Sequence, residues 1–139
     1  MALSAVAYGL LLPVIATLHV LHRPARDSGA ILGTIAGASV VALGAAAAAN
    51  VDLIPAALLV RGVWWWTVGK IWAETAMLSR TLGWATMALA LVCFAVVGIY
   101  AILGMAPAGP DLPLRMILGV WLIALAPLLW RSRARNMDR

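Results

Sequence analysis

The chain has 139 residues, of which 65% are hydrophobic and 11% are charged, and its formal net charge is +5. A soluble domain contains roughly 45–50% apolar residues, whereas here the apolar residues form long uncharged runs, which indicates an integral membrane protein. The basic residues occur in short loops and in the 131–139 tail, where membrane insertion favours Lys and Arg, so the positive charge does not predict nucleic-acid binding.

The first two apolar runs cover about residues 3–21 and 29–50. Pro13 predicts a kink in the first, which membrane helices tolerate. The second consists almost entirely of small residues, and four glycines recur in it at spacings of four, four and seven. These spacings place them on one narrow arc of a helix, where another backbone can approach closely. We expect this helix-packing face to contact a neighbouring helix of the same chain, or alternatively a second copy. Its members are Gly29, Gly33, Gly37 and Gly44.

The third apolar run, about 53–79, contains charges in its interior, which is costly in lipid and indicates either a working site or a segment that does not cross the bilayer. Lys70 and Glu74 are four residues apart, so they can pair on one helix face near the inner membrane surface. Arg61 has no acidic residue one turn away, and we expect a partner subunit or a lipid head group to satisfy it, or alternatively its side chain to extend to the outer membrane interface. The candidate residues for binding a ligand or partner are Arg61, Lys70, Glu74, Trp64, Trp65 and Trp72.

The last two apolar runs cover about residues 83–105 and 113–130. Trp84, Tyr100 and Trp130 lie near their ends, where interfacial aromatic residues are expected. The chain shows no internal repeat and no linker. We therefore predict an all-α integral membrane protein, residues 1–139, built as one small bundle of five transmembrane helices.

Two topologies compete for the segment 53–79. If it crosses the membrane, Arg23, Arg26 and Arg80 lie on the same side as the basic tail, in agreement with the positive-inside rule. If it is instead an interfacial amphipathic helix, four spans remain, and Arg23 and Arg26 lie on the opposite side from Lys70. We expect five spans, with the C-terminus in the cytoplasm and the protein in a bacterial inner membrane.

The sequence predicts no catalytic residues and no metal site, and it leaves any cofactor unknown. His19 and His22 lie one turn apart at the end of the first run. A metal site needs more ligands than this pair, and a haem would need a methionine as its second ligand. We expect a solvated pair at the membrane surface. No Ser–His–Asp set or paired carboxylates suitable for acid–base catalysis occur.

These patterns favour a non-enzymatic membrane subunit that packs in, or stabilises, a larger membrane complex or a homo-oligomer. Its expected partners are the lipid bilayer, including anionic lipids, and other protein subunits, but not nucleic acid. One alternative is a small transporter or ligand-binding bundle in which Arg61, Lys70 and Glu74 line a polar cavity. A second is a small membrane redox protein or enzyme that uses His19 or His22.

Overall fold

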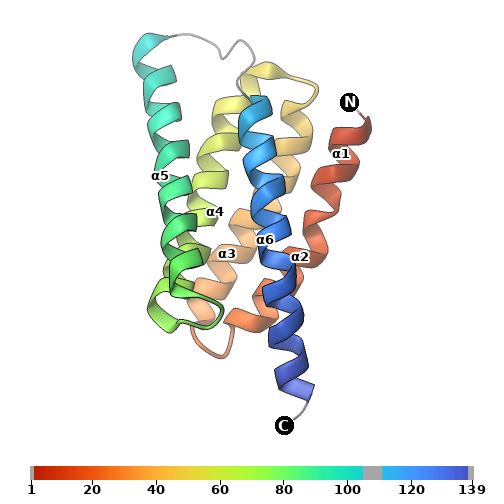
Figure 1. Cartoon of the computed structure of the whole chain (residues 1–139). Coiled ribbons are helices and arrows are strands. Elements are labelled where there is room, and N and C mark those ends of the chain that lie inside the picture. Colours follow the sequence, from red (N-terminus) through yellow and green to blue (C-terminus); the bar gives the residue numbers. More distant parts are fainter. Residues whose placement is uncertain (1, 105–110, 138–139) are drawn as a thin grey trace. The chain divides into compact units, whose positions relative to one another are not determined.

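The computed structural model describes residues 2–104 and 111–137, and these residues form helices and turns without any strand. The predicted all-α class is therefore confirmed. In chain order the elements are α1 (Ala2–Gly9), α2 (Leu11–His22), α3 (Asp27–Ala47), a short 3-10 helix (Val51–Leu53), α4 (Ile54–Thr75), α5 (Arg80–Leu103) and α6 (Asp111–Met137) (Figure 1).

The chain divides into two compact units, Met1–Pro107 and Ala108–Arg139. The second unit contains α6, which continues past the predicted end at residue 130 and has Pro127 inside it. The side chains of the basic tail, residues 131–139, lie outside the described part. The first unit contains α1 to α5, and all of the predicted site residues belong to it.

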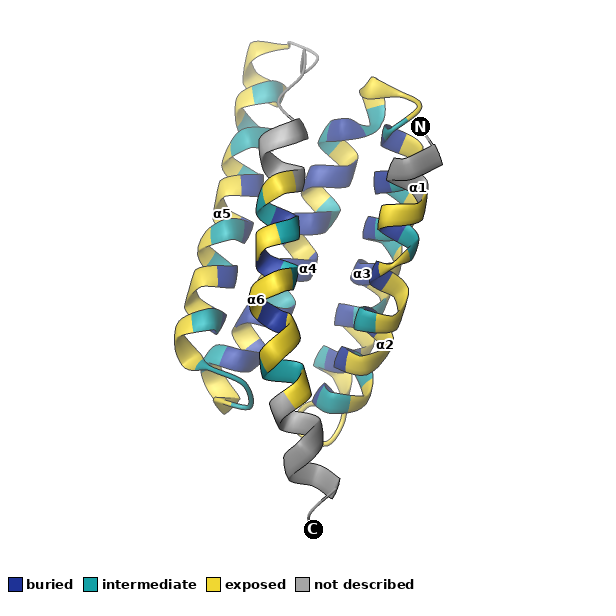
Figure 2. Ribbon diagram, turned by 45° about the vertical axis from the view of Figure 1, so that its right-hand side comes forward, coloured by how far each residue is buried: buried dark blue, intermediate teal, exposed yellow. Residues whose placement is uncertain are grey.

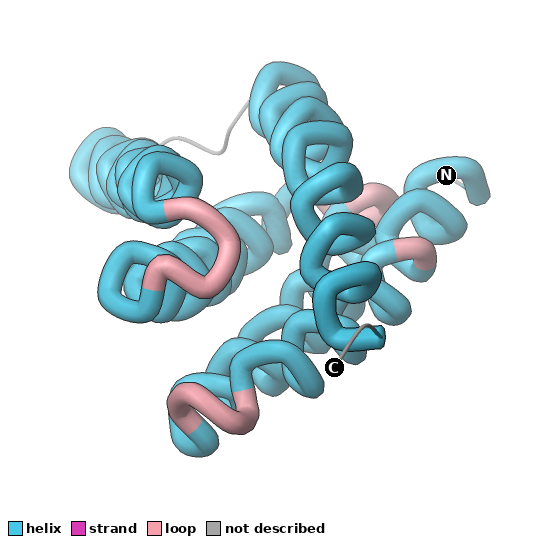
Figure 3. Tube along the Cα trace, turned by 60° about the horizontal axis from the view of Figure 1, so that its bottom comes forward, coloured by secondary structure: helices cyan, strands magenta, loops and turns pink. Residues whose placement is uncertain are grey.

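The helices of the first unit run up and down, because short turns connect consecutive helices. The α2–α3 turn and the α4–α5 turn therefore lie at one end of the unit, and the α3–α4 connection lies at the other (Figures 1 and 3). We call the end with the two turns the basic end. It carries Arg23, Arg26, Lys70 and Arg80.

Helix α4 is the central helix of this unit and packs against both α3 and α5. Buried residues recur along its whole length (Figure 2). Only a narrow stripe is exposed, and it is apolar until it reaches charged residues at the basic end. This stripe comprises Ala56, Leu59, Val63, Trp66, Lys70 and Glu74, and Thr75 is also exposed at the end of the helix.

The glycine face of α3 packs within its own chain. A Cβ atom at Gly37 would lie 3.0 Å from the indole nitrogen of Trp64, and one at Gly44 would overlap the ring of Tyr8. The other two glycines of this face lie against side chains of α4. The four glycines of this face thus lie against side chains of the same chain.

A second glycine contact, which the sequence analysis did not predict, joins α4 to α5. A Cβ atom at Gly83 would lie 2.5 Å from the backbone nitrogen of Ala73 and 2.8 Å from the carbonyl oxygen of Gly69. Gly62, seven residues before Gly69, leaves room for the ring of Phe94 in the same way. The two helices can cross this closely because side chains are absent at these positions.

The first apolar run forms two helices, interrupted at Leu10. Pro13 has no backbone N–H, so it cannot bond to the carbonyl of Gly9 four residues earlier, and its ring crowds that carbonyl. The kink predicted at Pro13 therefore appears as an interruption of the helix about one turn earlier, at Leu10.

Helix α4 ends at Thr75, four residues before the predicted end at 79. Ala76 adopts a left-handed conformation with φ of 51°, and its N–H bonds to the carbonyl of Trp72. The next helix then begins, because the side chain of Ser79 accepts a hydrogen bond from the N–H of Leu82 as an N-cap. The sequence predicts that the helix continues to residue 79, because a left-handed helix end is usually marked by a glycine and none occurs here.

Replacing Ala76 with Gly is expected to raise the free energy of unfolding by up to about 1 kcal/mol, because glycine adopts a left-handed conformation without steric strain. Reversible unfolding in mixed detergent micelles would measure the change. The matched control is Ala88→Gly inside α5, which should lower stability by about 1 kcal/mol through helix propensity. Equal losses in the two variants would contradict a left-handed Ala76.

Candidate functional site

Arg61 is buried at the centre of the first unit, where its side chain is 1% exposed. Its Nη2 group donates a hydrogen bond of 2.7 Å to the hydroxyl of Tyr8. Tyr8 comes from α1, and Gly44 of α3 provides the space for its ring. The guanidinium of Arg61 thus has a partner in its own chain, which the sequence analysis did not predict.

The tryptophans proposed for partner binding are also internal. Trp64, Trp65 and Trp72 are between 0% and 1% exposed. Successive residues in a helix point about 100° apart, so three consecutive tryptophans cannot share one face. Trp64 packs toward α3, whereas Trp66 points outward with 37% of its surface exposed. Trp66 is therefore the member of the run that remains accessible, although the sequence analysis did not select it.

His22 joins α2 to the central helix. The indole nitrogen of Trp72 donates a hydrogen bond of 2.7 Å to Nε2 of His22, and both side chains are buried. An indole N–H can only donate, so Nε2 must be the unprotonated nitrogen and the proton of the neutral ring lies on Nδ1. The expected solvated histidine pair is wrong at this residue, because the ring serves as a contact between helices.

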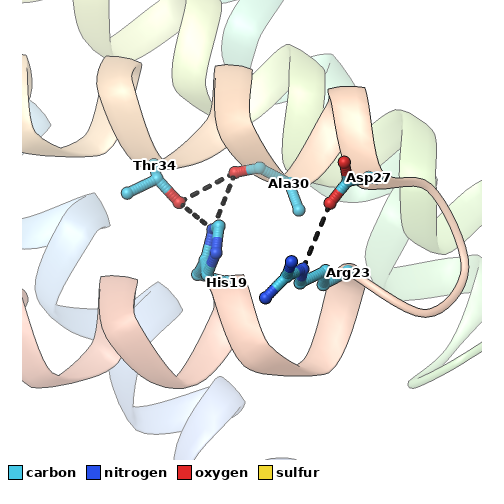
Figure 4. A network of polar contacts seen from close by, with 5 residues as sticks. All are labelled: His19, Arg23, Asp27, Ala30 and Thr34. Atoms are coloured by element: carbon cyan, nitrogen blue, oxygen red, sulfur yellow. Dashed lines mark hydrogen bonds and ion pairs between the residues drawn. The ribbon is translucent and has the colours of Figure 1, made fainter.

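His19 makes the corresponding contact to α3 (Figure 4). Its Nδ1 lies 2.8 Å from the hydroxyl oxygen of Thr34, and that hydroxyl donates its own hydrogen to the carbonyl of Ala30. The hydroxyl oxygen therefore accepts from His19, which places the ring proton on Nδ1. The two histidines diverge toward different helices and do not form one binding site.

A network of ion pairs ties the two turns of the basic end together. Glu74 pairs with Lys70 at 3.9 Å, as the spacing predicted, and it also accepts a hydrogen bond from Arg26 in the α2–α3 turn. Arg23 and Asp27 form a separate pair at 3.3 Å across the same turn (Figure 4). These side chains are half-exposed or more, so each pair contributes little stability by itself.

The structure does not bring Arg61 together with Lys70 and Glu74. Nine residues separate Arg61 from Lys70, or about 13–14 Å along the axis of α4 at about 1.5 Å per residue. Arg61 is buried with Tyr8, while the other two residues form the surface network. A small hollow between α2, α3 and α4, lined by His19, His22 and apolar neighbours, has no room for a water molecule.

Among the side chains that the structure describes, those of residues 6–104 and 116–130, no three of His, Cys, Asp or Glu converge in a metal-binding arrangement. Comparison of the chain with protein-family models, curated proteins and solved structures finds no match. The function must therefore be inferred from the residues and their packing.

Proposed function

We propose that the protein spans the membrane five times, with the basic end in the cytoplasm of a bacterium. Three helices, Asp27–Ala47, Val51–Thr75 and Arg80–Leu103, are long and apolar enough to cross a bilayer. The contact between Arg26 and Glu74 supports a spanning third segment. If 53–79 were an interfacial helix after two spans, these residues would lie on opposite sides of a hydrocarbon core about 30 Å thick.

We further propose that the protein is a non-enzymatic subunit that packs in, or stabilises, a larger membrane complex or a homo-oligomer. The observation that carries this proposal is that interior polar side chains bond to one another: Arg61 to Tyr8, His22 to Trp72, and His19 to Thr34. Groups used in this way hold helices together and are not directed at a ligand. What the protein offers to its surroundings is apolar surface.

The packing surface proposed here differs from the one expected from the sequence, because the glycine face of α3 and the buried tryptophans are already used internally. Helix α5 is the least buried of the three long apolar helices. Exposed residues recur along it every three or four positions, and alanines lie between large side chains, as at a helix–helix seam. This α5 stripe comprises Ala88, Leu91, Ala95, Ile99 and Ile102.

Replacing Ala95 with Trp is expected to reduce assembly at least several-fold, because a large side chain at a small position of the α5 stripe keeps a partner helix away. Light scattering of the detergent-solubilised protein, together with the proteins that co-purify with it, would measure assembly. The matched control is Ala38→Trp, at an exposed alanine on α3. Both variants should retain the helical circular dichroism spectrum.

A wild-type protein that purified as a monomer, with no co-purifying subunit, would contradict the proposal. Unchanged assembly in Ala95→Trp would show that the α5 stripe faces lipid. Assembly lost equally in Ala38→Trp would also count against this surface, because the control lies on another helix.

A further inference from the structure

The cations of the basic end are not equally neutralised. Arg23 pairs with Asp27, while Arg26 and Lys70 share Glu74. Arg80 is exposed and has no acidic partner among the residues whose side chains are described, 6–104 and 116–130. Four cationic and two acidic side chains leave this end with an excess of two positive charges. Arg80 is the member of the set that is available to an external anion.

An exposed indole lies beside this cation. Trp84 is 63% exposed and follows Arg80 by four residues in α5, so the two side chains start about 5–6 Å apart on one helix face. Thr81, next to Arg80, is also exposed. Trp84 lies one turn further from the basic end than Arg80. In a spanning α5 the indole therefore lies at the level of the lipid glycerol groups, and the guanidinium lies at the level of the phosphates.

We propose that Arg80 and Trp84 form a binding site for the head group of an anionic phospholipid of the inner leaflet. This inference rests on the proposed membrane topology. The guanidinium can donate two parallel hydrogen bonds to a phosphodiester, and the indole N–H adds a donor toward the lipid carbonyls. The positive excess at this end repels the ammonium group of a zwitterionic lipid, and this selects the anionic lipid.

Lipid retention by Arg80→Gln tests the site. The full chain is reconstituted into nanodiscs that contain equal amounts of phosphatidylglycerol and phosphatidylcholine, then transferred to detergent, and the lipids that remain bound are counted by native mass spectrometry. Arg80→Gln should weaken phosphatidylglycerol binding about fivefold, the effect of one basic residue at an anionic surface. The matched control is Lys70→Gln, which removes one charge from the same end at a residue of α4 outside the proposed site, and it should weaken binding less. Arg80→Lys keeps the charge but not the paired hydrogen bonds, so its binding should lie between those of the wild type and Arg80→Gln. Trp84→Leu should also weaken binding.

The result that would overturn the site is equal phosphatidylglycerol retention by the wild type and Arg80→Gln, with both proteins inserted and helical. Equal weakening in Arg80→Gln and Lys70→Gln would also overturn it, because the net charge would then act without a defined site. Failure of the proposed topology would appear separately. In that case protease or labelling reagents would reach the α2–α3 and α4–α5 turns from opposite sides of the membrane, whatever lipid is bound.

Discussion

Replacing Gly83 with Ala is expected to lower the free energy of unfolding by about 3 kcal/mol or more. The added Cβ would lie 2.5 Å from the backbone nitrogen of Ala73 and 3.0 Å from its Cα atom. These are backbone atoms, so no side-chain rotation relieves the clash. The two helices must move apart, and the contacts along the whole α4–α5 crossing weaken together.

The matched control is Gly98→Ala in the same helix, where an added Cβ meets no atom within 4 Å. It should leave the stability unchanged or raise it by up to about 1 kcal/mol, because alanine favours the helix more than glycine does. Reversible unfolding in mixed micelles, followed by circular dichroism, would compare the two variants. Similar stabilities for both would mean that α4 and α5 do not cross at Gly83.

Features that depend on residues close together in the chain could be predicted from the sequence. The helical class follows from apolar runs of the length a helix needs to cross a bilayer. The glycine face of α3 and the pair of Lys70 with Glu74 follow from helical periodicity, and the structure has both. The contact of Gly62 and Gly69 with α5 could have been found in the same way, because a spacing of seven residues returns to the same face.

Contacts between helices distant in sequence could not be predicted. Periodicity tells which side of a helix is small or polar, but it does not tell which other helix lies opposite. Arg26 and Glu74 are separated by 48 residues, and His22 and Trp72 by 50. Only the folded bundle makes them neighbours, and a sequence read one segment at a time therefore assigns such polar residues to solvent, lipid or a partner.

The intrachain partner of Arg61 could not be predicted for the same reason. No acidic residue lies within one turn of it, so the local pattern indicates a partner outside the chain. The partner is a tyrosine hydroxyl 53 residues away. Tyr8 gave no signal, because a tyrosine near the end of an apolar run also fits the interfacial position common in membrane proteins.

Replacing Tyr8 with Phe is expected to lower the free energy of unfolding by about 1.5–3 kcal/mol, the range for a hydrogen bond to a charged group. The ring remains in the space beside Gly44, and only the oxygen that accepts from Arg61 is lost. Tyr100→Phe in α5 is the matched control. Its hydroxyl makes no hydrogen bond to the described residues, so the same change should have little effect there.

A double-mutant cycle assigns the loss to Arg61 and separates the pair from other effects of the tyrosine. In an Arg61→Met background no buried charge needs the hydroxyl, so Tyr8→Phe should cost less than about 0.5 kcal/mol. An undiminished cost in that background would show that Tyr8 stabilises the bundle without Arg61. A smaller cost of Tyr8→Phe in the Arg61→Met background would mean that the two side chains are coupled. The buried charge of Arg61 would then serve to join α1 to α4. Function would then be sought on the outer surfaces of the bundle, where the α5 stripe and Arg80 lie.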